Sequence, residues 1–341
     1  MSLATTYDAA PVEIPATRKL TVVQAIQDAL ALELARDPAV LVLGEDVGRD
    51  GGVFRATEGL LDAFGPERVV DTPLAESGII GTSIGLALTG FRPVAEIQFL
   101  GFVYPAVNQL LAHAARYRNR TRGAFHVPLV VRSPHGAGIH APEHHGEAYE
   151  AMFVNAPGLK VAIPSDPIDA KGLLLAAIRD DDPVVFLEPT RLYRAFRQDV
   201  PTGDYVVPLG RAAVKREGRD VSILSWGAMV RVALQAAEQL GSEGVSAEVV
   251  DLRTLNPLDL DAVLASVEKT GRAVVVHEAP RAAGFGAELA ALIQERALLS
   301  LLAPVQRVAG FDTPPPYARL EELYLPSPAR VVGAVRTTLD F

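Results

Sequence analysis

The sequence contains no cysteine among its 341 residues. This absence excludes disulfide bonds, thiolate nucleophiles and cysteine-ligated zinc sites. No apolar run approaches the roughly 20 residues that a membrane-spanning helix needs. The N-terminus also has no basic region followed by an apolar one, which is the pattern of a signal peptide. We therefore expect a protein without a membrane segment, located in the cytoplasm.

The chain has no excess of basic residues: 32 Lys and Arg stand against 41 Asp and Glu, for a net charge of −9. This balance disfavours a general role in binding nucleic acid or anionic membranes. One basic cluster runs against it, with Arg116, Arg118, Arg120 and Arg122 just before Gly123. A phosphate or RNA site is one interpretation. Cations gathered at the C-terminal end of a helix are the favoured one.

Several motifs of common enzyme classes are missing. The glycine-rich string at residues 44–52 follows a predicted strand but does not fit G-x-G-x-x-G, and no P-loop lysine pattern occurs. Neither Ser83 nor Ser225 sits in a G-x-S-x-G turn. A dinucleotide-binding dehydrogenase and a serine hydrolase are therefore weak hypotheses.

Hydrophobic residues make up 49% of the chain and charged residues 21%, which is rich enough for large cores or a large subunit interface. Short apolar runs alternate with segments of helical periodicity, and this alternation predicts parallel sheets covered on both faces. A chain of this length favours two domains. We predict an N-terminal arm at residues 1–18, a first α/β domain at 19–200, a linker at 201–218 and a second α/β domain at 219–341. Expected helices include one capped by Thr21, one long helix at 99–117 and one at 328–339.

The stretch at residues 69–88 has the most unusual composition. It reads as a strand, a turn through Pro73 and an uncharged helix that begins at Glu76. Three glycines, Gly78, Gly81 and Gly85, lie in this helix, although each costs about 0.5–1 kcal/mol relative to alanine. We infer that another backbone or a ligand approaches the helix closely. Glu76 either complements the helix dipole or serves in catalysis, and both interpretations stay open.

Four histidines lie in a glycine-rich loop, together with Glu143 and Glu147. They are His135, His140, His144 and His145. This set could bind zinc as a structural metal or a hydrolase site. A single histidine that faces an active site is the favoured alternative, since nothing in the loop predicts a fixed register.

Many of these strings, taken in order, resemble the beta chain of the decarboxylase component of 2-oxo acid dehydrogenases. The resemblance runs from about Thr21 to Phe341. It is carried by Gly44-Glu-Asp-Val, Gly52-Val-Phe-Arg, Asp71-Thr-Pro-Leu-x-Glu76, Ala95-Glu-Ile-Gln-Phe99, Ala170-Lys-Gly-Leu and Asp251-Leu-Arg-Thr. Ser225-Trp-Gly, His277-Glu-Ala-Pro and Gly310-x-Asp-Thr-Pro look closer to the branched-chain enzymes.

The resemblance implies a transketolase-like α/β fold, with a pyrimidine-binding domain followed by a smaller C-terminal domain. It further implies thiamine diphosphate shared with an alpha subunit in an α2β2 heterotetramer, and acyl transfer from a 2-oxo acid to a lipoyl acyltransferase core. Magnesium would be held mainly by the alpha subunit, because the metal-binding Gly-Asp-Gly motif is absent from this chain. We expect a branched-chain substrate. The alternatives are a pyruvate or acetoin dehydrogenase beta subunit and a non-catalytic docking scaffold.

The resemblance also assigns site residues. Glu76 matches the carboxyl group that hydrogen-bonds the aminopyrimidine ring, and His145 matches a histidine that handles protons during decarboxylation and acyl transfer. The other expected cofactor-binding residues are Glu45, Leu74, Gln98 and Phe102. A potassium ion in some relatives is held at positions that match Leu129, Val130, Ala177, Asp180 and Asp182.

Overall fold

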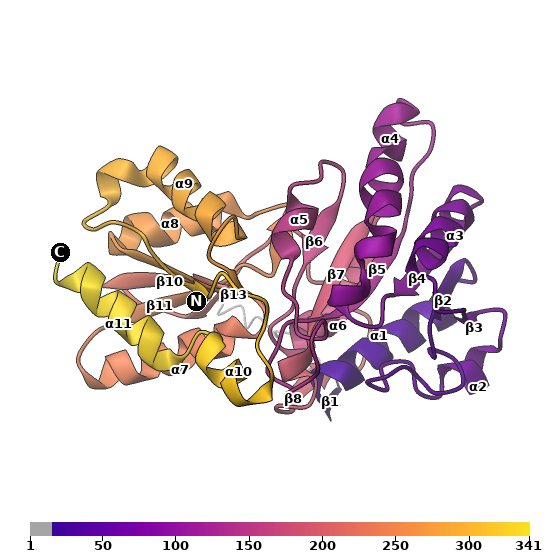
Figure 1. The fold of residues 1–341 in the computed structure, drawn as a ribbon, viewed down its shortest axis with the longest axis horizontal. Helices are drawn as coiled ribbons and strands as arrows, with labels where there is room; N and C mark the ends of the chain where they lie inside the picture. Colours follow the sequence, from indigo (N-terminus) through magenta and orange to yellow (C-terminus); the bar gives the residue numbers. More distant parts are fainter. Residues whose placement is uncertain (1–15) are drawn as a thin grey trace, which may run out of the picture.

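The computed structural model describes residues 16–341, which form two α/β units lying side by side (Figure 1). Each unit has its own sheet of mostly parallel strands, with helices on both faces. The predicted α/β class with parallel sheets is therefore confirmed. Within this part of the chain, no helix combines the length and the apolarity needed to cross a bilayer. The predicted arm at residues 1–18 lies almost wholly outside the described residues.

The first unit contains a seven-stranded sheet in the order β12-β6-β7-β5-β4-β2-β3. Its strands are β2 (Val40–Gly44), β3 (Val69–Asp71), β4 (Arg92–Glu96), β5 (Val130–His135), β6 (Lys160–Ala162), β7 (Val184–Pro189) and β12 (Thr254–Asn256). All neighbours are parallel except β12, which comes from the second half of the chain and pairs antiparallel with β6. The carboxyl ends of the parallel strands consequently meet at one edge, where ligands bind in open α/β sheets.

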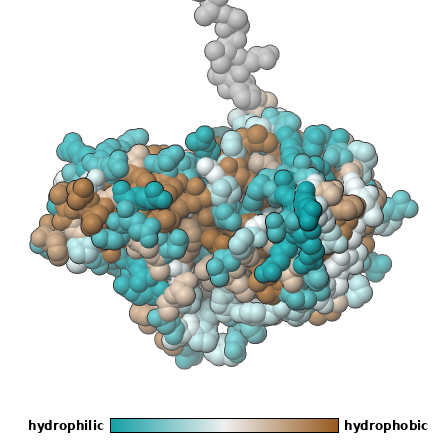
Figure 2. Space-filling model, turned by 90° about the horizontal axis from the view of Figure 1, so that it is seen from above, coloured by the Kyte–Doolittle hydropathy of each residue, from teal (hydrophilic) through white to brown (hydrophobic). Residues whose placement is uncertain are grey.

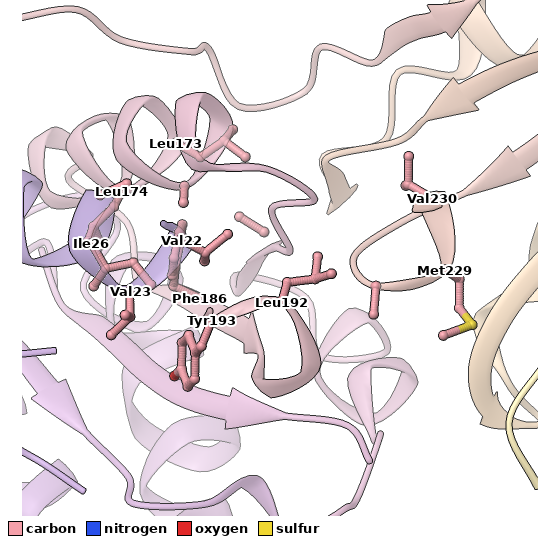
Figure 3. Packing of buried hydrophobic residues seen from close by; sticks show 14 of the residues in the cluster. Val22, Val23, Ile26, Leu173, Leu174, Phe186, Leu192, Tyr193, Met229 and Val230 are labelled. Atoms are coloured by element: carbon pink, nitrogen blue, oxygen red, sulfur yellow. The ribbon is translucent and has the colours of Figure 1, made fainter. Parts of the chain in front are cut away.

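One face of this sheet is covered by α1 (Val22–Arg36) and α6 (Pro167–Arg179). Thr21 caps α1 as predicted: its hydroxyl accepts the backbone N–H of Gln24, whose side chain bonds back to Thr21. Figure 3 shows the apolar side chains of α1 and α6 beside Phe186 of β7. Because both helices are apolar at helical spacing, burying that stripe stabilises the pair against the sheet.

The other face is covered by α3 (Glu76–Leu88) and by residues 100–120, where the predicted long helix is present but is not a regular α-helix. After η1 (Leu100–Phe102), the helical turns follow one another without a break from residue 104 to 120, as η2 (Tyr104–Ala106), η3 (Gln109–His113), η4 (Ala114–Arg116) and α4 (Tyr117–Arg120). Gly101 packs directly against the backbone of His144, and Pro105 has no N–H to donate. The continuous helical turns therefore begin at residue 104, after the close contact of Gly101, and Pro105 lies in their first turn, where a missing N–H is tolerated.

The basic cluster lies at the end of these turns. The side chains of Arg116 and Arg120 donate to the carbonyl oxygens of Leu111 and Ala112, at 3.1 and 2.8 Å. Gly123 follows with a φ of +81°. These contacts favour the predicted role at a helix terminus.

The second unit contains a five-stranded sheet in the order β14-β13-β10-β11-β9, in which β9 is antiparallel to its neighbour. Its strands are β9 (Ala213–Arg216), β10 (Val221–Ser225), β11 (Ala247–Asp251), β13 (Ala273–Pro280) and β14 (Gln306–Gly310). Helices α7 (Met229–Ser242) and α11 (Pro328–Leu339) pack together, as do α8 (Leu260–Thr270) and α9 (Phe285–Ala297). The predicted helix at 328–339 is therefore confirmed.

The connection between the units is more ordered than a linker at residues 201–218 suggests. β8 (Gln198–Pro201) ends at the first residue of the predicted linker and pairs antiparallel with β1 (Thr17–Leu20). β9 lies within the predicted linker. Within the predicted linker, residues 202–212 and 217–218 are free of helix and strand. The predicted stretch is thus partly an edge strand of the second sheet.

Candidate active site

Glu76 is the first residue of α3, directly after the turn that leaves β3. Only 8% of its surface is exposed, although the preceding Ala75 provides no side-chain cap. The first helical N–H groups have no partner within a helix, so they offer hydrogen-bond donors to an anion placed there. At the end of β3, the Asp71 carboxylate accepts the N–H groups of Gly48 and Arg49 at 2.6 and 3.1 Å, which fixes the glycine-rich loop beside the start of this turn.

Glu45 lies at the end of β2 and is also 8% exposed. Burial raises the pKa of its carboxyl group, and the nearby charge of Glu76 adds to the shift. Next to it, the Gln98 amide donates to the Asp46 carboxylate at 3.2 Å. The structure therefore gathers Glu45, Glu76 and Gln98 at the carboxyl edge of the first sheet.

A buried triad of charged side chains lies at the carboxyl ends of three neighbouring strands, β4, β5 and β7. It was not predicted from the sequence. Arg132 of β5 binds Glu96 of β4 at 2.9 Å and Glu188 of β7 at 2.6 Å, and Tyr193 donates to Glu188 at 2.6 Å. Burial alone disfavours the charge on Arg132, but the two carboxylates raise its pKa above the usual value. A sequence signal was present, because Glu96, Arg132 and Glu188 each follow a short apolar run.

His145 packs against two aromatic rings. Its ring centroid lies 4.5 Å from that of Phe99 and 5.0 Å from that of Phe102. The Nδ1 atom lies 2.8 Å from the carbonyl oxygen of Glu143, which can only accept, so Nδ1 carries the proton. Within the described part of the chain, the Nε2 atom makes no such contact and is the ring nitrogen left to exchange a proton with a ligand. The structure thus brings two predicted residues, His145 and Phe102, into contact.

Leu74 is placed differently, with 79% of its surface exposed beside the turn into α3. Its side chain is therefore accessible to a ligand or to a neighbouring chain.

The other three histidines of the predicted zinc set each contact a different carboxylate. His135 pairs with Glu150 at 3.1 Å, His140 with Glu321 at 3.5 Å and His144 with Glu147 at 3.6 Å. Across residues 16–341, no group of three or more His, Cys, Asp or Glu side chains is arranged to hold a metal ion. This arrangement disfavours the zinc alternative.

The two aspartates of the predicted potassium site already contact cationic side chains. The Asp180 carboxylate accepts Lys160 Nζ at 2.7 Å, and its carbonyl oxygen accepts Arg92 at 3.0 Å. Asp182 pairs with Arg118 at 2.7 Å. The carbonyl oxygens of Leu129 and Ala177 accept N–H groups of neighbouring backbone, and Val130 lies within β5. The carboxylates therefore do not fit an additional cation, and the potassium site stays a prediction.

A second buried cluster joins the two units near the start of the histidine loop. The Trp226 indole donates to Glu150 at 3.1 Å, and its ring stacks on His277 at 5.4 Å and 5°. Burial lowers the pKa of His277 to about 4, so its ring is neutral at pH 7. Burial raises the pKa of the adjacent Glu278 to about 7. Trp226, His277 and Glu278 carry part of the resemblance, which gives them no role in the site.

Comparison with known proteins agrees with this fold. The family described as "Transketolase, pyrimidine binding domain" matches residues 18–195, and "Transketolase, C-terminal domain" matches residues 210–331. A solved structure described as "Split gene transketolase, inactive beta4 tetramer" superposes with a TM-score of 0.71 at 25% identity, covering 95% of this chain and 99% of that one.

Sequence relatives narrow the family. The chain is 56% identical to the "Pyruvate dehydrogenase E1 component subunit beta" of Bacillus subtilis and 54% identical to that of Staphylococcus epidermidis. Each comparison spans 323 residues, 95% of this chain and 99% of the relative. These relatives do not support the predicted branched-chain type and fit the pyruvate alternative better. The chain belongs to the transketolase-like family of beta subunits of 2-oxo acid dehydrogenases.

Proposed function

We propose that the chain is the beta subunit of a cytoplasmic, thiamine diphosphate-dependent pyruvate dehydrogenase. In this role it takes part in decarboxylating pyruvate and in passing the acetyl group to a lipoyl arm on an acyltransferase core. The observation that carries the proposal is the identity of 56% over nearly the whole chain to a pyruvate dehydrogenase beta subunit. An acetoin or branched-chain substrate is the alternative that the experiment below separates from it.

The residues at the carboxyl edge of the first sheet fit one end of the cofactor. Glu76 offers a buried carboxyl group at the first turn of α3, and Glu45 beside it has a raised pKa. Such a group can share a proton with a ring nitrogen. Leu74, Gln98 and Phe102 would surround the pyrimidine. The cofactor supplies the carbanion stabilisation, and the protein supplies position and protonation state.

His145 provides the second function in this proposal. Its Nε2 atom is free to take or give a proton, because Nδ1 is held by the carbonyl oxygen of Glu143. The rings of Phe99 and Phe102 limit how far the imidazole can turn. A base of this kind contributes about 10²–10⁴-fold to a proton-transfer step.

The site is proposed to be completed by an alpha subunit in an α2β2 heterotetramer. The sequence has no Gly-Asp-Gly motif for magnesium and the diphosphate; its nearest string, at residues 203–205, lacks the second glycine. Figure 2 shows hydrophobic areas among the polar ones on the face seen from above. The solved relative described as an inactive beta4 tetramer is consistent with a beta chain that is inactive without a partner.

The test is a substrate comparison with the assembled enzyme. The chain is purified with an alpha-type chain, thiamine diphosphate and Mg²⁺, and acyl transfer to a lipoylated acyltransferase domain is measured. We expect kcat/KM for pyruvate to exceed those for 3-methyl-2-oxobutanoate and acetoin at least tenfold. Equal or better use of either competitor would contradict the proposed substrate. Assembly without consumption of any of the three would favour the docking scaffold.

A further inference from the structure

The histidine loop, residues 136–146, is held from two sides. On the side of the first unit, the His145 ring packs on Phe99 and Phe102, and the loop backbone at His144 packs against Gly101. The second unit contacts the other side through side chains that accept backbone N–H groups. The proposed site therefore depends on how the two units meet.

Glu278 is the first of these side chains. It lies on β13, is 5% exposed, and its Oε1 atom accepts the N–H of Ala137. The preceding Gly136 has a φ of +80°, and a Cβ atom there would lie 2.6 Å from the same oxygen. The loop backbone thus turns tightly over the Glu278 carboxyl group, which a side chain at position 136 would displace.

Glu321 is the second. It lies on α10 (Ala318–Tyr324), is 4% exposed, and accepts the N–H of His140 at 3.0 Å. The His140 ring also lies 3.5 Å from this carboxylate. A weaker contact comes from the exposed Tyr317, whose hydroxyl lies 3.3 Å from Glu143. Two buried carboxyl groups therefore bond the loop backbone three residues apart.

These bonds act on a segment that has little order of its own. Glycines at positions 136, 138 and 146 leave its backbone many conformations, and no helix or strand is formed between them. Fixing each residue of the loop costs conformational entropy, so hydrogen bonds from outside the loop decide whether it is ordered. Buried acceptors bond N–H groups strongly because no water competes for them.

We propose that Glu278 and Glu321 are positioning residues that hold the histidine loop, so that His145 keeps its place against Phe99 and Phe102. They contact the loop backbone and act on the reaction only through His145. This inference rests on the proposed role of His145. The second unit then has a part in the chemistry, since it sets the geometry of a residue that belongs to the first.

The experiment measures loop order and chemistry separately, in the full chain assembled with an alpha-type chain. Hydrogen exchange is followed for loop peptides that contain Ala137 and His140 in Glu278→Ala and Glu321→Ala. We expect at least tenfold faster exchange there, unchanged exchange in β5 and β10, and at least tenfold slower single-turnover acyl transfer. Glu278→Gln and Glu321→Gln keep an acceptor oxygen and should restore most of both. Glu295→Ala, an exposed carboxylate on α9, is the matched control.

The outcomes separate this inference from the proposed function. Unchanged loop exchange in both alanine variants overturns the positioning role. Faster exchange with normal acyl transfer also overturns it, provided that His145→Ala slows transfer. If His145→Ala leaves transfer at the wild-type rate, the proposed role of His145 is wrong, while faster exchange still shows that the carboxylates hold the loop. Should Glu278→Ala fail to fold, Glu321→Ala and the two glutamine variants decide the question.

Discussion

At the residue scale, the candidate site consists largely of carboxyl groups that the fold buries at strand and helix ends. Glu45 and Glu76 are both 8% exposed, and a buried carboxyl group keeps its charge only where donors or cations compensate it. The amides at the start of α3 supply such donors. The neighbouring triad shows the other solution, with Arg132 between Glu96 and Glu188.

Replacing Glu76 tests the centre of the proposed site. Glu76→Gln keeps the size of the side chain but cannot share a proton, so we expect intact assembly with an alpha-type chain and kcat lower by about 10²–10⁴-fold. Steady-state turnover and size-exclusion chromatography give the two readouts. Glu67→Gln, at an exposed position before β3, is the control. If Glu76→Gln keeps more than a third of the wild-type kcat, the proposed catalytic role of Glu76 is wrong.

Glu278 makes a second prediction, on stability and pH. Burial raises its pKa from 4.5 to about 7, against the opposing effect of His135 and Arg191; Glu150 and Tyr324 also face it. The folded state therefore binds a proton more tightly than the unfolded state. Its contribution to stability is complete below pH 4.5 and is lost as the pH rises to about 7.

Glu278→Gln cannot ionise, so it should escape this loss. We expect it to be more stable than the wild type at pH 8, by roughly 3 kcal/mol at most, and to lose most of that advantage by pH 5. Thermal unfolding at the two pH values measures the difference. The depressed pKa of His277 destabilises both proteins equally below pH 6.5 and cancels. An advantage that is the same at both pH values would contradict the shift.

At the element scale, the glycines of α3 have no neighbour in the described part of the chain that would exclude a larger side chain. We inferred close approach by another backbone or a ligand. Within residues 16–341, however, a Cβ at Gly81 would come no nearer than 4.0 Å to any neighbour, and one at Gly85 would meet nothing within 4 Å. Gly78 and Gly85 are exposed. No neighbour within residues 16–341 accounts for these glycines, whereas the proposed alpha subunit, if it packs on α3, would.

The prediction is a helix substitution with opposite effects on folding and assembly. Gly85→Ala should stabilise the isolated chain by about 0.5–1 kcal/mol, through helix propensity, and should weaken binding of the alpha-type chain. Denaturant unfolding and calorimetric titration measure the two effects. Gly333→Ala, at an exposed glycine of α11 that also has open space around it, should stabilise the chain equally without affecting assembly. Tighter or unchanged assembly of Gly85→Ala would count against a partner on α3.

Elements also show what could be read from the sequence. The helices α1 and α11 were predictable because periodicity and local signals such as Thr21 agree with the fold. The changes of helix type within residues 104–120 were not predictable, because no sequence signal marks them. The position of Glu76 before a glycine-rich helix marked it as a candidate, and the roles of Glu76 and His145 came from the resemblance. Glu278 was missed because its partner Ala137 lies 141 residues away in the chain.

At the scale of the whole molecule, the proposed site is one half of a cofactor site. We expect that this chain alone will neither bind thiamine diphosphate and Mg²⁺ at micromolar concentration nor turn over pyruvate, because the groups that clamp the diphosphate are absent. Every 1.4 kcal/mol of lost binding free energy costs a factor of ten in Kd. Calorimetric titration with and without an alpha-type chain is the measurement. Micromolar binding and decarboxylation by this chain alone would disprove the shared site.

The position of strand β12 limits how the chain can be divided into separately expressed halves. It belongs to the second half of the sequence, yet it completes the sheet of the first unit, and the Asn256 side chain donates to the Leu159 carbonyl oxygen at 2.6 Å. A gene cut after residue 218 would encode a first unit with the edge of β6 bare, and bare edges invite aggregation. The two halves of the sequence therefore share one sheet. A first half expressed or transferred by itself would lack the strand that covers β6.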